Sequence, residues 1–201
     1  MGSDGEVEES TMKKIYLLFL FCSIAAVSFV SCTKSSTSEI SYDKKSYVEV
    51  CGLKWATKNV GATEDNPYGN YYTYEQALGA CPDGWRLPTS DELEQLSQFH
   101  SMAVIYNGLH GVWFSGSTPY KDGVDAIFLP MAGRYEGMGT VVGGVEVLVG
   151  YVGCYWSSTD GDAGYAAYKL DFGNKLDFGS ELVFVRCDSR NDGYSVRCVK
   201  D

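Results

Sequence analysis

The chain has 201 residues, of which 45% are hydrophobic, and it carries a formal net charge of −10 at pH 7. This acidity argues against nucleic acid and anionic lipid surfaces as partners, because like charges repel. The residues from 42 to 201 suffice for one domain with a single sizeable core. Abundant glycine and 15 tyrosines favour short strands and turns over a helical bundle.

A targeting signal is expected near the start of the chain. The lysine pair at 13–14 precedes an apolar run over 15–30, which is shorter than the roughly 20 apolar residues that span a bilayer. This pattern predicts a secretory signal peptide over 1–31, with Met12 as the natural start. Cys32 lies where bacterial lipoproteins carry their lipidated cysteine and is the predicted lipidation site. Ordinary cleavage, with Cys32 as a plain thiol, is the alternative.

The segment that follows, 32–41, is polar and predicts a flexible tether in front of the domain over 42–201. Thr33 stands where an aspartate retains many bacterial lipoproteins at the inner membrane. We therefore expect a cell-envelope protein that is held at the outer membrane by its lipid anchor, and exposure at the cell surface is compatible with this address.

The first half of the domain predicts a hairpin followed by a short element. Alternating side chains favour paired strands over 47–50 and 53–57. Residues 71–74 are aromatic and favour a strand, whereas Thr73 has the character of a cap for a short helix over 74–80.

A second helix follows a turn over 82–84, where proline, aspartate and glycine supply turn chemistry. Thr89 is the expected N-cap of this helix, with Glu92 in the capping-box position. Apolar residues at helical spacing then predict a buried face, and the helix is expected to end near 100–102.

The rest of the domain predicts strands, with a hairpin or long loop over 137–153. The expected strands are 112–115, 126–130, 155–158, 166–171, 182–186 and 195–200. Two helices and several short strands indicate the α+β class with a mainly antiparallel sheet and long loops.

Five cysteines follow Cys32 in an exported chain, which favours disulfides over metal ligands. A bond between Cys81 and Cys198 would close most of the domain into one loop, worth about 4–5 kcal/mol in the chain-entropy model. A second bond between Cys154 and Cys187 is an alternative that would leave Cys51 as the odd thiol.

Five motifs occur in a fixed order along the domain. They are Gly-Leu-Lys-Trp-Ala-Thr-Lys-Asn-Val-Gly at 52–61, Gly-Asn-Tyr-Tyr at 69–72, Cys-Pro-Asp-Gly-Trp-Arg-Leu-Pro-Thr at 81–89, Tyr-Trp-Ser-Ser-Thr at 155–159 and Ser-Val-Arg-Cys-Val at 195–199. Together they resemble the Fibrobacter succinogenes major paralogous domain family over 48–201. The resemblance implies a secreted or lipid-anchored protein, frequent in gut Bacteroidetes, with a C-type-lectin-like fold close to that of formylglycine-generating enzymes. The family has no established biochemical activity.

No residue is predicted to be catalytic, and we do not expect an enzyme. His100, expected late in the second helix, and His110 are the only histidines, and no Gly-x-Ser-x-Gly elbow accompanies them. The segment 84–89 is similar to sulfatase-modifying enzymes, but their other signature motif is missing, so such an enzyme is only an alternative.

Oxygen-rich turns suggest one metal alternative. Asp160, Asp162, Asp188 and Asp192 lie near expected strand ends and could supply oxygen ligands to Ca²⁺. Turn-forming aspartates need no ion to explain them, so we expect no cofactor, with calcium as the alternative.

Aromatic residues supply the candidate ligand surface, because tyrosine and tryptophan are enriched where proteins bind. The candidates are Trp113, Tyr120, Tyr135 and Tyr151, whereas Trp55, Trp85 and Trp156 are expected in the core. The leading hypothesis is a non-enzymatic lipoprotein whose lectin-like module binds a glycan or an envelope protein. A structural or adhesin subunit of a surface assembly is the alternative.

Overall fold

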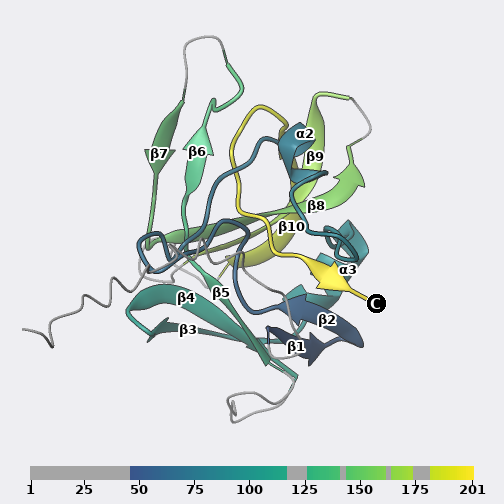
Figure 1. Cartoon of the computed structure of the whole chain (residues 1–201), viewed down its shortest axis with the longest axis vertical. Helices are drawn as coiled ribbons and strands as arrows, with labels where there is room; N and C mark the ends of the chain where they lie inside the picture. The colour runs from purple at the N-terminus through teal and green to yellow at the C-terminus, as the bar shows by residue number, and fades with distance from the viewer. Residues whose placement is uncertain (1–45, 117–125, 141–143, 162–163, 174–181) are drawn as a thin grey trace, which may run out of the picture. The chain divides into compact units, whose positions relative to one another are not determined.

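The computed structural model describes residues 46–116, 126–140, 144–161, 164–173 and 182–201 (Figure 1). All of them belong to one compact unit, Ser41–Asp201. Several predicted features lie outside the described residues, namely the signal peptide, Met12, Cys32, Thr33 and the tether, Tyr120 and Asp162. Among the residues that are described, no helix is long and apolar enough to cross a membrane.

Antiparallel sheets build the domain. The first has the order β1-β2-β11, with bounds Tyr47–Val50, Leu53–Ala56 and Val199–Lys200. The second has the order β3-β4-β5, with bounds His100–Tyr106, Leu109–Ser115 and Ala126–Pro130. The third has the order β10-β9-β8, with bounds Leu182–Ser189, Ala166–Gly173 and Val152–Asp160. The fourth pairs β6, Arg134–Glu136, with β7, Val145–Val147.

Two short helices among the described residues complete the α+β class, α2 over Tyr74–Ala77 and α3 over Ser90–Ser97. In α3 the Thr89 hydroxyl accepts a hydrogen bond from the Glu92 amide and the Glu92 side chain accepts one from the Thr89 amide, which completes the predicted capping box. In α2 the Gln76 side chain accepts a hydrogen bond from the Thr73 amide. Thr73 therefore caps a helix, but that helix ends at Ala77 rather than at residue 80.

The expected end of the second helix near 100–102 is wrong. Helix α3 stops at Ser97, and His100 opens strand β3 instead of lying late in a helix. Strand β3 pairs with β4 through a turn in which Asn107 and Gly108 have φ values of +50° and +80°. An Asn-Gly pair in this conformation forms the type I′ turn that joins hairpin strands, and this long-range pairing overrides the helical spacing.

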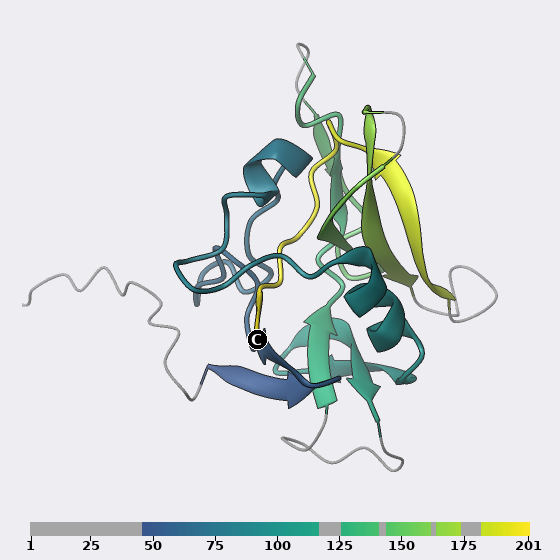
Figure 2. The ribbon, with the colours of Figure 1, turned by 90° about the vertical axis from the view of Figure 1, so that its right-hand side faces the viewer.

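The C-terminal segment is less regular than the predicted strand over 195–200. Only Val199–Lys200 pairs as a strand, with β2, while Tyr194 and Ser195 form single bridges to Tyr72 and Tyr155. Figure 2 shows this yellow segment running between α2 and the β8–β10 sheet. The segment 137–153, predicted as a hairpin or a long loop, contains strand β7, which pairs with β6, and the first residues of β8, which begins at Val152.

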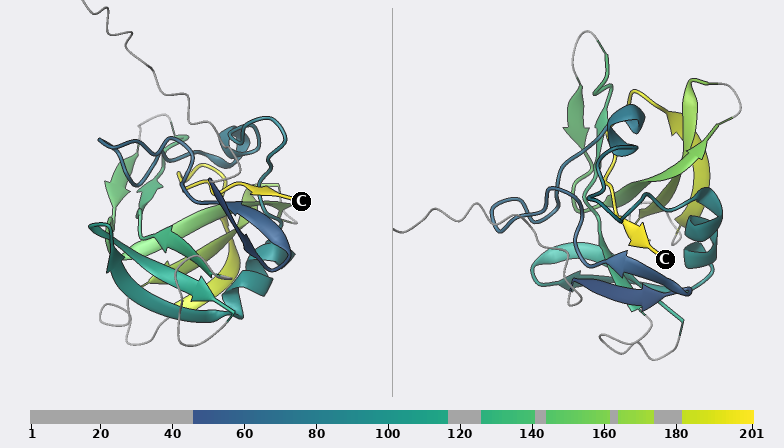
Figure 3. Two further views of the ribbon diagram at one scale, coloured as in Figure 1. Left: turned by 60° about the horizontal axis from the view of Figure 1, so that its bottom comes forward. Right: turned by 45° about the vertical axis from the view of Figure 1, so that its right-hand side comes forward.

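The β10-β9-β8 sheet has a buried cluster on each face. One cluster packs under α3 and against the β3–β5 sheet and the β1–β2 hairpin. This sheet and this hairpin lie next to each other in Figure 3. The cluster includes Trp55, Leu93, Phe114, Tyr155, Leu170 and Phe172. The opposite cluster includes Tyr74, Cys154, Trp156, Tyr194, Val196 and Cys198. Side chains of successive strand residues point to opposite faces, so consecutive residues of one strand belong to different clusters, as Tyr155 and Trp156 do.

Candidate functional site

Motif residues from three distant segments meet in a buried polar network. Arg197 donates hydrogen bonds to Asn59 Oδ1 at 2.7 and 2.9 Å and to the Ala56 carbonyl at 2.8 Å. Asn59 Nδ2 donates to the Tyr155 hydroxyl at 3.1 Å, which donates to the Pro130 carbonyl at 2.8 Å. Burial raises the pKa of Tyr155 to about 12, so its phenol keeps its proton. These bonds lock the three segments together.

The Gly-Trp-Arg-Leu-Pro-Thr motif has a similar structural role. Arg86 forms a bidentate ion pair with Glu92, with both N–O distances 2.8 Å, and it also donates a hydrogen bond to the Asp201 carboxylate at 2.6 Å. Glu92 in turn accepts a bond from the Thr89 backbone amide. Trp85 lies half-buried against the second cluster rather than in the full core predicted for it, whereas Trp55 and Trp156 are fully buried as expected.

A cleft of about 300 Å³ opens beside the Arg197 network, and we call it the hairpin cleft. It lies between the loop after β2, the end of the β3–β4 hairpin and β5. Its polar and aromatic lining includes Lys58, Asn59, Thr63, Tyr106, Asn107 and Phe128. This volume is at the lower end of the range for small-molecule sites, and aromatic rings with a few polar groups are the usual lining.

Tyr106 and Phe128 line the hairpin cleft and form a cluster of three aromatic rings with Trp113. Tyr106 lies 5.1 Å from Trp113 and 5.2 Å from Phe128, and these last two rings are 5.4 Å apart, measured between centroids. Trp113 is only 7% exposed, so its predicted place on a ligand surface is wrong. It lies beneath Tyr106, which is the half-buried ring that lines the cleft.

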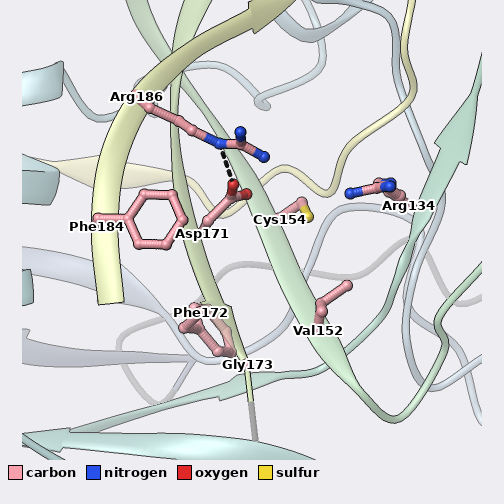
Figure 4. A pocket seen from close by; sticks show the side chains of 8 residues that line it. All are labelled: Arg134, Val152, Cys154, Asp171, Phe172, Gly173, Phe184 and Arg186. Atoms are coloured by element: carbon pink, nitrogen blue, oxygen red, sulfur yellow. Dashed lines mark hydrogen bonds and ion pairs between the residues drawn. The ribbon is translucent and has the colours of Figure 1, made fainter. Parts of the chain in front are cut away.

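A smaller cavity of about 80 Å³ lies on the β10-β9-β8 sheet, and we call it the arginine pocket (Figure 4). Its main lining residues are Arg134, Val152, Cys154, Asp171, Phe184 and Arg186. Figure 4 shows the Arg134 and Arg186 side chains reaching in from opposite sides, with the Cys154 thiol between them. Cross-strand pairing explains part of this arrangement, because Cys154 and Phe184 are both direct partners of Asp171.

A buried charge network lies beside the arginine pocket. Lys169 is fully buried, with its ammonium ion-paired to Asp171, 3.3 Å from Asp188 and 4.4 Å from the centre of the Tyr194 ring. Arg186 Nε reaches the second oxygen of Asp171 at 2.6 Å. Burial raises the pKa of Asp188, but the Lys169 charge and hydrogen bonds outweigh this effect, and the net pKa is lowered.

The three predicted calcium ligands that the structure describes are held by other groups. Asp160 pairs with Arg190, Asp188 lies in the charge network, and Asp192 accepts a hydrogen bond from the Gly137 amide at 2.7 Å. Among the described residues there is no group of three or more histidines, cysteines or acids that could hold a metal ion. Asp162 lies outside those residues, and calcium binding stays a prediction.

The remaining predicted ligand residues are scattered. Tyr135 is half-buried against Tyr71, with ring centres 6.0 Å apart, whereas Tyr151 is 53% exposed. Three other exposed apolar residues, Val145, Leu148 and Val149, lie within six positions of Tyr151 in the sequence. Neither tyrosine is a main lining residue of the two cavities described above.

The disulfide predicted between Cys81 and Cys198 is confirmed, with the two Cα atoms 5.8 Å apart. The alternative second bond is wrong, because Cys154 and Cys187 remain thiols. The cross-strand neighbour of Cys154 is Asp171, and that of Cys187 is Tyr168. Positions 168 and 171 of β9 point to opposite faces of the sheet, so the two thiols also lie on opposite faces. Cys51 lies in the β1–β2 turn, outside the disulfide.

The fold and its cavities define a disulfide-linked α+β domain of antiparallel sheets, in which the shared motifs hold the scaffold and the cavities lie beside it. The family model of the Fibrobacter succinogenes major domain matches residues 32–200. The chain therefore belongs to this family, as the motif resemblance predicted. Comparison with curated proteins and with solved structures gave no significant match.

Sequence reasoning missed Tyr106 and Asn107 at the hairpin cleft, and Arg134 and Arg186 at the arginine pocket. An Asn-Gly pair between two β-prone runs was a readable hairpin signal for the first site. No local pattern marks the second, because two arginines 52 positions apart meet only through the pairing of strands.

Proposed function

We propose that the chain is a non-enzymatic outer-membrane lipoprotein whose lectin-like domain binds a glycan in the hairpin cleft. The observation that carries this proposal is a cleft of about 300 Å³ with an aromatic base and a polar rim. Sugar rings present apolar faces and many hydroxyl groups, which match an aromatic ring such as Tyr106 beside amide, hydroxyl and ammonium groups.

The rim supplies both kinds of hydrogen-bonding partner. Lys58 and Thr63 come from the loop after β2, and Asn107 comes from the hairpin turn. Ammonium and amide groups donate, whereas hydroxyl and amide oxygens accept. The Arg197 network supports this wall from inside, and a ligand would meet a rigid surface that loses little entropy on binding.

Glycan binding is tested with the full chain, purified in a neutral detergent, on a glycan array. We expect selective binding that Tyr106→Ala weakens by about 2 kcal/mol or more, as for the aromatic anchors of other interfaces. Tyr106→Phe keeps the ring and should retain binding. Tyr165→Ala is the matched control, because Tyr165 is 73% exposed and contributes no ring to the cleft. An array without hits, or equal binding by Tyr106→Ala, would contradict the proposal.

The lipid anchor needs a separate test, because Cys32 lies outside the described residues. We expect mass spectrometry of the protein purified from membranes to find a diacylglycerol-modified cysteine at the N-terminus, and Cys32→Ser to release the protein from the membrane fraction. Membrane retention of Cys32→Ser without any acyl modification would contradict this part of the proposal.

A subunit of a surface assembly is the second candidate function. The four exposed apolar side chains within the short segment from Val145 to Tyr151 favour it, since exposed apolar residues that form a contiguous patch commonly mark protein interfaces. In that case crosslinking in intact cells should recover an envelope protein, and Tyr151→Ser should abolish its recovery, whereas the glycan array should show no binding.

A further inference from the structure

The arginine pocket has two cationic walls from separate sheets. Arg134 lies on β6 and Arg186 on β10, and both side chains reach the space above Cys154 (Figure 4). Two guanidinium groups directed at one small cavity repel each other, and an anion between them would replace this repulsion with attraction.

Carboxylates already contact both arginines: Glu136 contacts Arg134, whereas Asp171 and, at 3.5 Å from Nη2, Asp188 contact Arg186. Arg134 Nε donates to Glu136 at 3.0 Å, and Nη2 contacts the same oxygen; Arg186 Nε donates to Asp171 at 2.6 Å. A guanidinium has five N–H donors. Among the described residues, the Nη1 group of neither arginine has a hydrogen-bond partner, which leaves donors for a further acceptor.

Cys154 contributes no negative charge to the pocket. Burial raises the pKa of the Cys154 thiol to about 12, although the Lys169 charge opposes this, so the thiol is protonated at neutral pH. Asp171 is the acid in the wall, and its two oxygens are already taken by Lys169 and Arg186.

The volume of the arginine pocket and its apolar walls limit the kind of ligand that can bind there. A cavity of about 80 Å³ holds on the order of two or three waters by liquid volume, which suits one oxyanion group rather than a whole sugar. Val152 and Phe184 are apolar, and such walls strengthen charge-assisted hydrogen bonds by excluding water. Phe184 is 37% exposed and offers a surface for the uncharged part of a ligand.

We propose that the arginine pocket is a binding site for a small oxyanion group, a carboxylate or a sulfate, held between Arg134 and Arg186. This site shares none of its main lining residues with the hairpin cleft and does not depend on glycan binding there.

The test is calorimetric titration of the full chain, in neutral detergent and dilute Tris chloride buffer, with D-glucuronate, sodium sulfate and D-glucose. We expect glucuronate or sulfate to bind and glucose not to bind. Tighter binding of glucuronate identifies a carboxylate ligand, and tighter binding of sulfate identifies a sulfated one. Arg134→Gln should weaken binding about tenfold or more, the usual effect of losing a charged hydrogen-bonding partner.

Three further variants control this experiment. Lys200→Gln removes one exposed positive charge elsewhere and should leave the affinity unchanged. Arg134→Lys keeps the positive charge but loses the planar guanidinium group, so its affinity should fall between that of the wild type and that of Arg134→Gln. Tyr106→Ala alters only the hairpin cleft and should bind normally, so the two proposals fail separately. Absence of binding by both anions, or equal binding by a folded Arg134→Gln, would overturn the oxyanion site.

Discussion

Lys169 places a charged ammonium group entirely inside the protein, on the sheet face that also carries Asp171 and Asp188. Removing a charge from water is unfavourable unless partners surround it. Two carboxylates and the face of the Tyr194 ring supply those partners here. Burying the Lys169 charge costs free energy, but removing it would also destabilise the protein, because Asp171 and Asp188 would each lose a counter-ion.

We predict that Lys169→Met lowers the free energy of unfolding by about 3–5 kcal/mol, the range for breaking a buried ion pair on one side. Urea denaturation measures this loss. Lys200→Met is the control, because Lys200 is exposed, and its effect should stay within about 0.5 kcal/mol. A Lys169→Met protein as stable as the wild type would show that the network contributes no net stability.

Glu92 combines a helix cap with an ion pair. The hydrogen bonds from Arg86, followed by those from Thr89, lower the pKa of this carboxyl below its usual 4.5, although burial opposes them. Because the folded protein lowers this pKa, the ionised group stabilises the fold above pH 4.5. That stabilisation is lost as the pH falls through the lowered folded-state value.

We therefore predict that Glu92→Gln destabilises the protein by about 1–2 kcal/mol at neutral pH. The difference from the wild type should shrink as the pH falls from about 4.5 through the lowered folded-state pKa, because the unfolded wild-type chain binds a proton at this carboxyl before the folded protein does. Urea titrations at a series of pH values check this. Glu94→Gln, at an exposed position of α3, should show no such convergence; a constant Glu92→Gln difference down to pH 3 would contradict the prediction.

At the scale of elements, close cross-strand packing explains one glycine in the β8–β9 pair. Gly153 is the direct partner of Phe172, and a Cβ atom at residue 153 would lie 2.1 Å from the Phe172 ring. The ring therefore covers the glycine and packs in the buried cluster under α3. Any larger residue would force the ring out of this position.

Gly153→Ala should destabilise the protein by about 1–3 kcal/mol, the range for overpacking a core. Gly79→Ala is the matched control, because nothing lies within 4 Å of a Cβ at that position, and it should be neutral or slightly stabilising. Thermal denaturation of both variants provides the comparison. Equal melting temperatures would mean that the β8–β9 pair yields without cost.

Elements were predictable where local chemistry decides them. The capping residues Thr73 and Thr89 mark both helix starts, because a cap bonds to backbone groups only two or three positions away. Strand β3 was missed, since the spacing of Leu93, Leu96 and Phe99 continues a helical pattern beyond the true end. Pairing of β3 with β4 decides that boundary.

At the scale of the whole molecule, the bond between Cys81 and Cys198 joins the segment before α3 to the C-terminal segment across 117 positions. We predict that the double variant Cys81→Ala/Cys198→Ala loses about 4–5 kcal/mol of unfolding free energy, because its unfolded chain regains the entropy that a loop this long removes. Denaturant unfolding measures the loss. Cys187→Ala is the control, since Cys187 is an exposed thiol, and it should change little.

The sequence alone determined the family, the α+β class, both described helix starts and the disulfide, because motifs and caps are readable from neighbouring residues and the disulfide from the cysteines. Only the tertiary structure decided which side chains meet. The approach of Arg134 and Arg186 to Cys154 depends on how the β6–β7 and β10-β9-β8 sheets pack, and the position of Tyr106 over Trp113 depends on the register of β3 and β4. Register places residues that are far apart in the chain on one face or on opposite faces of a sheet, and long-range packing sets it.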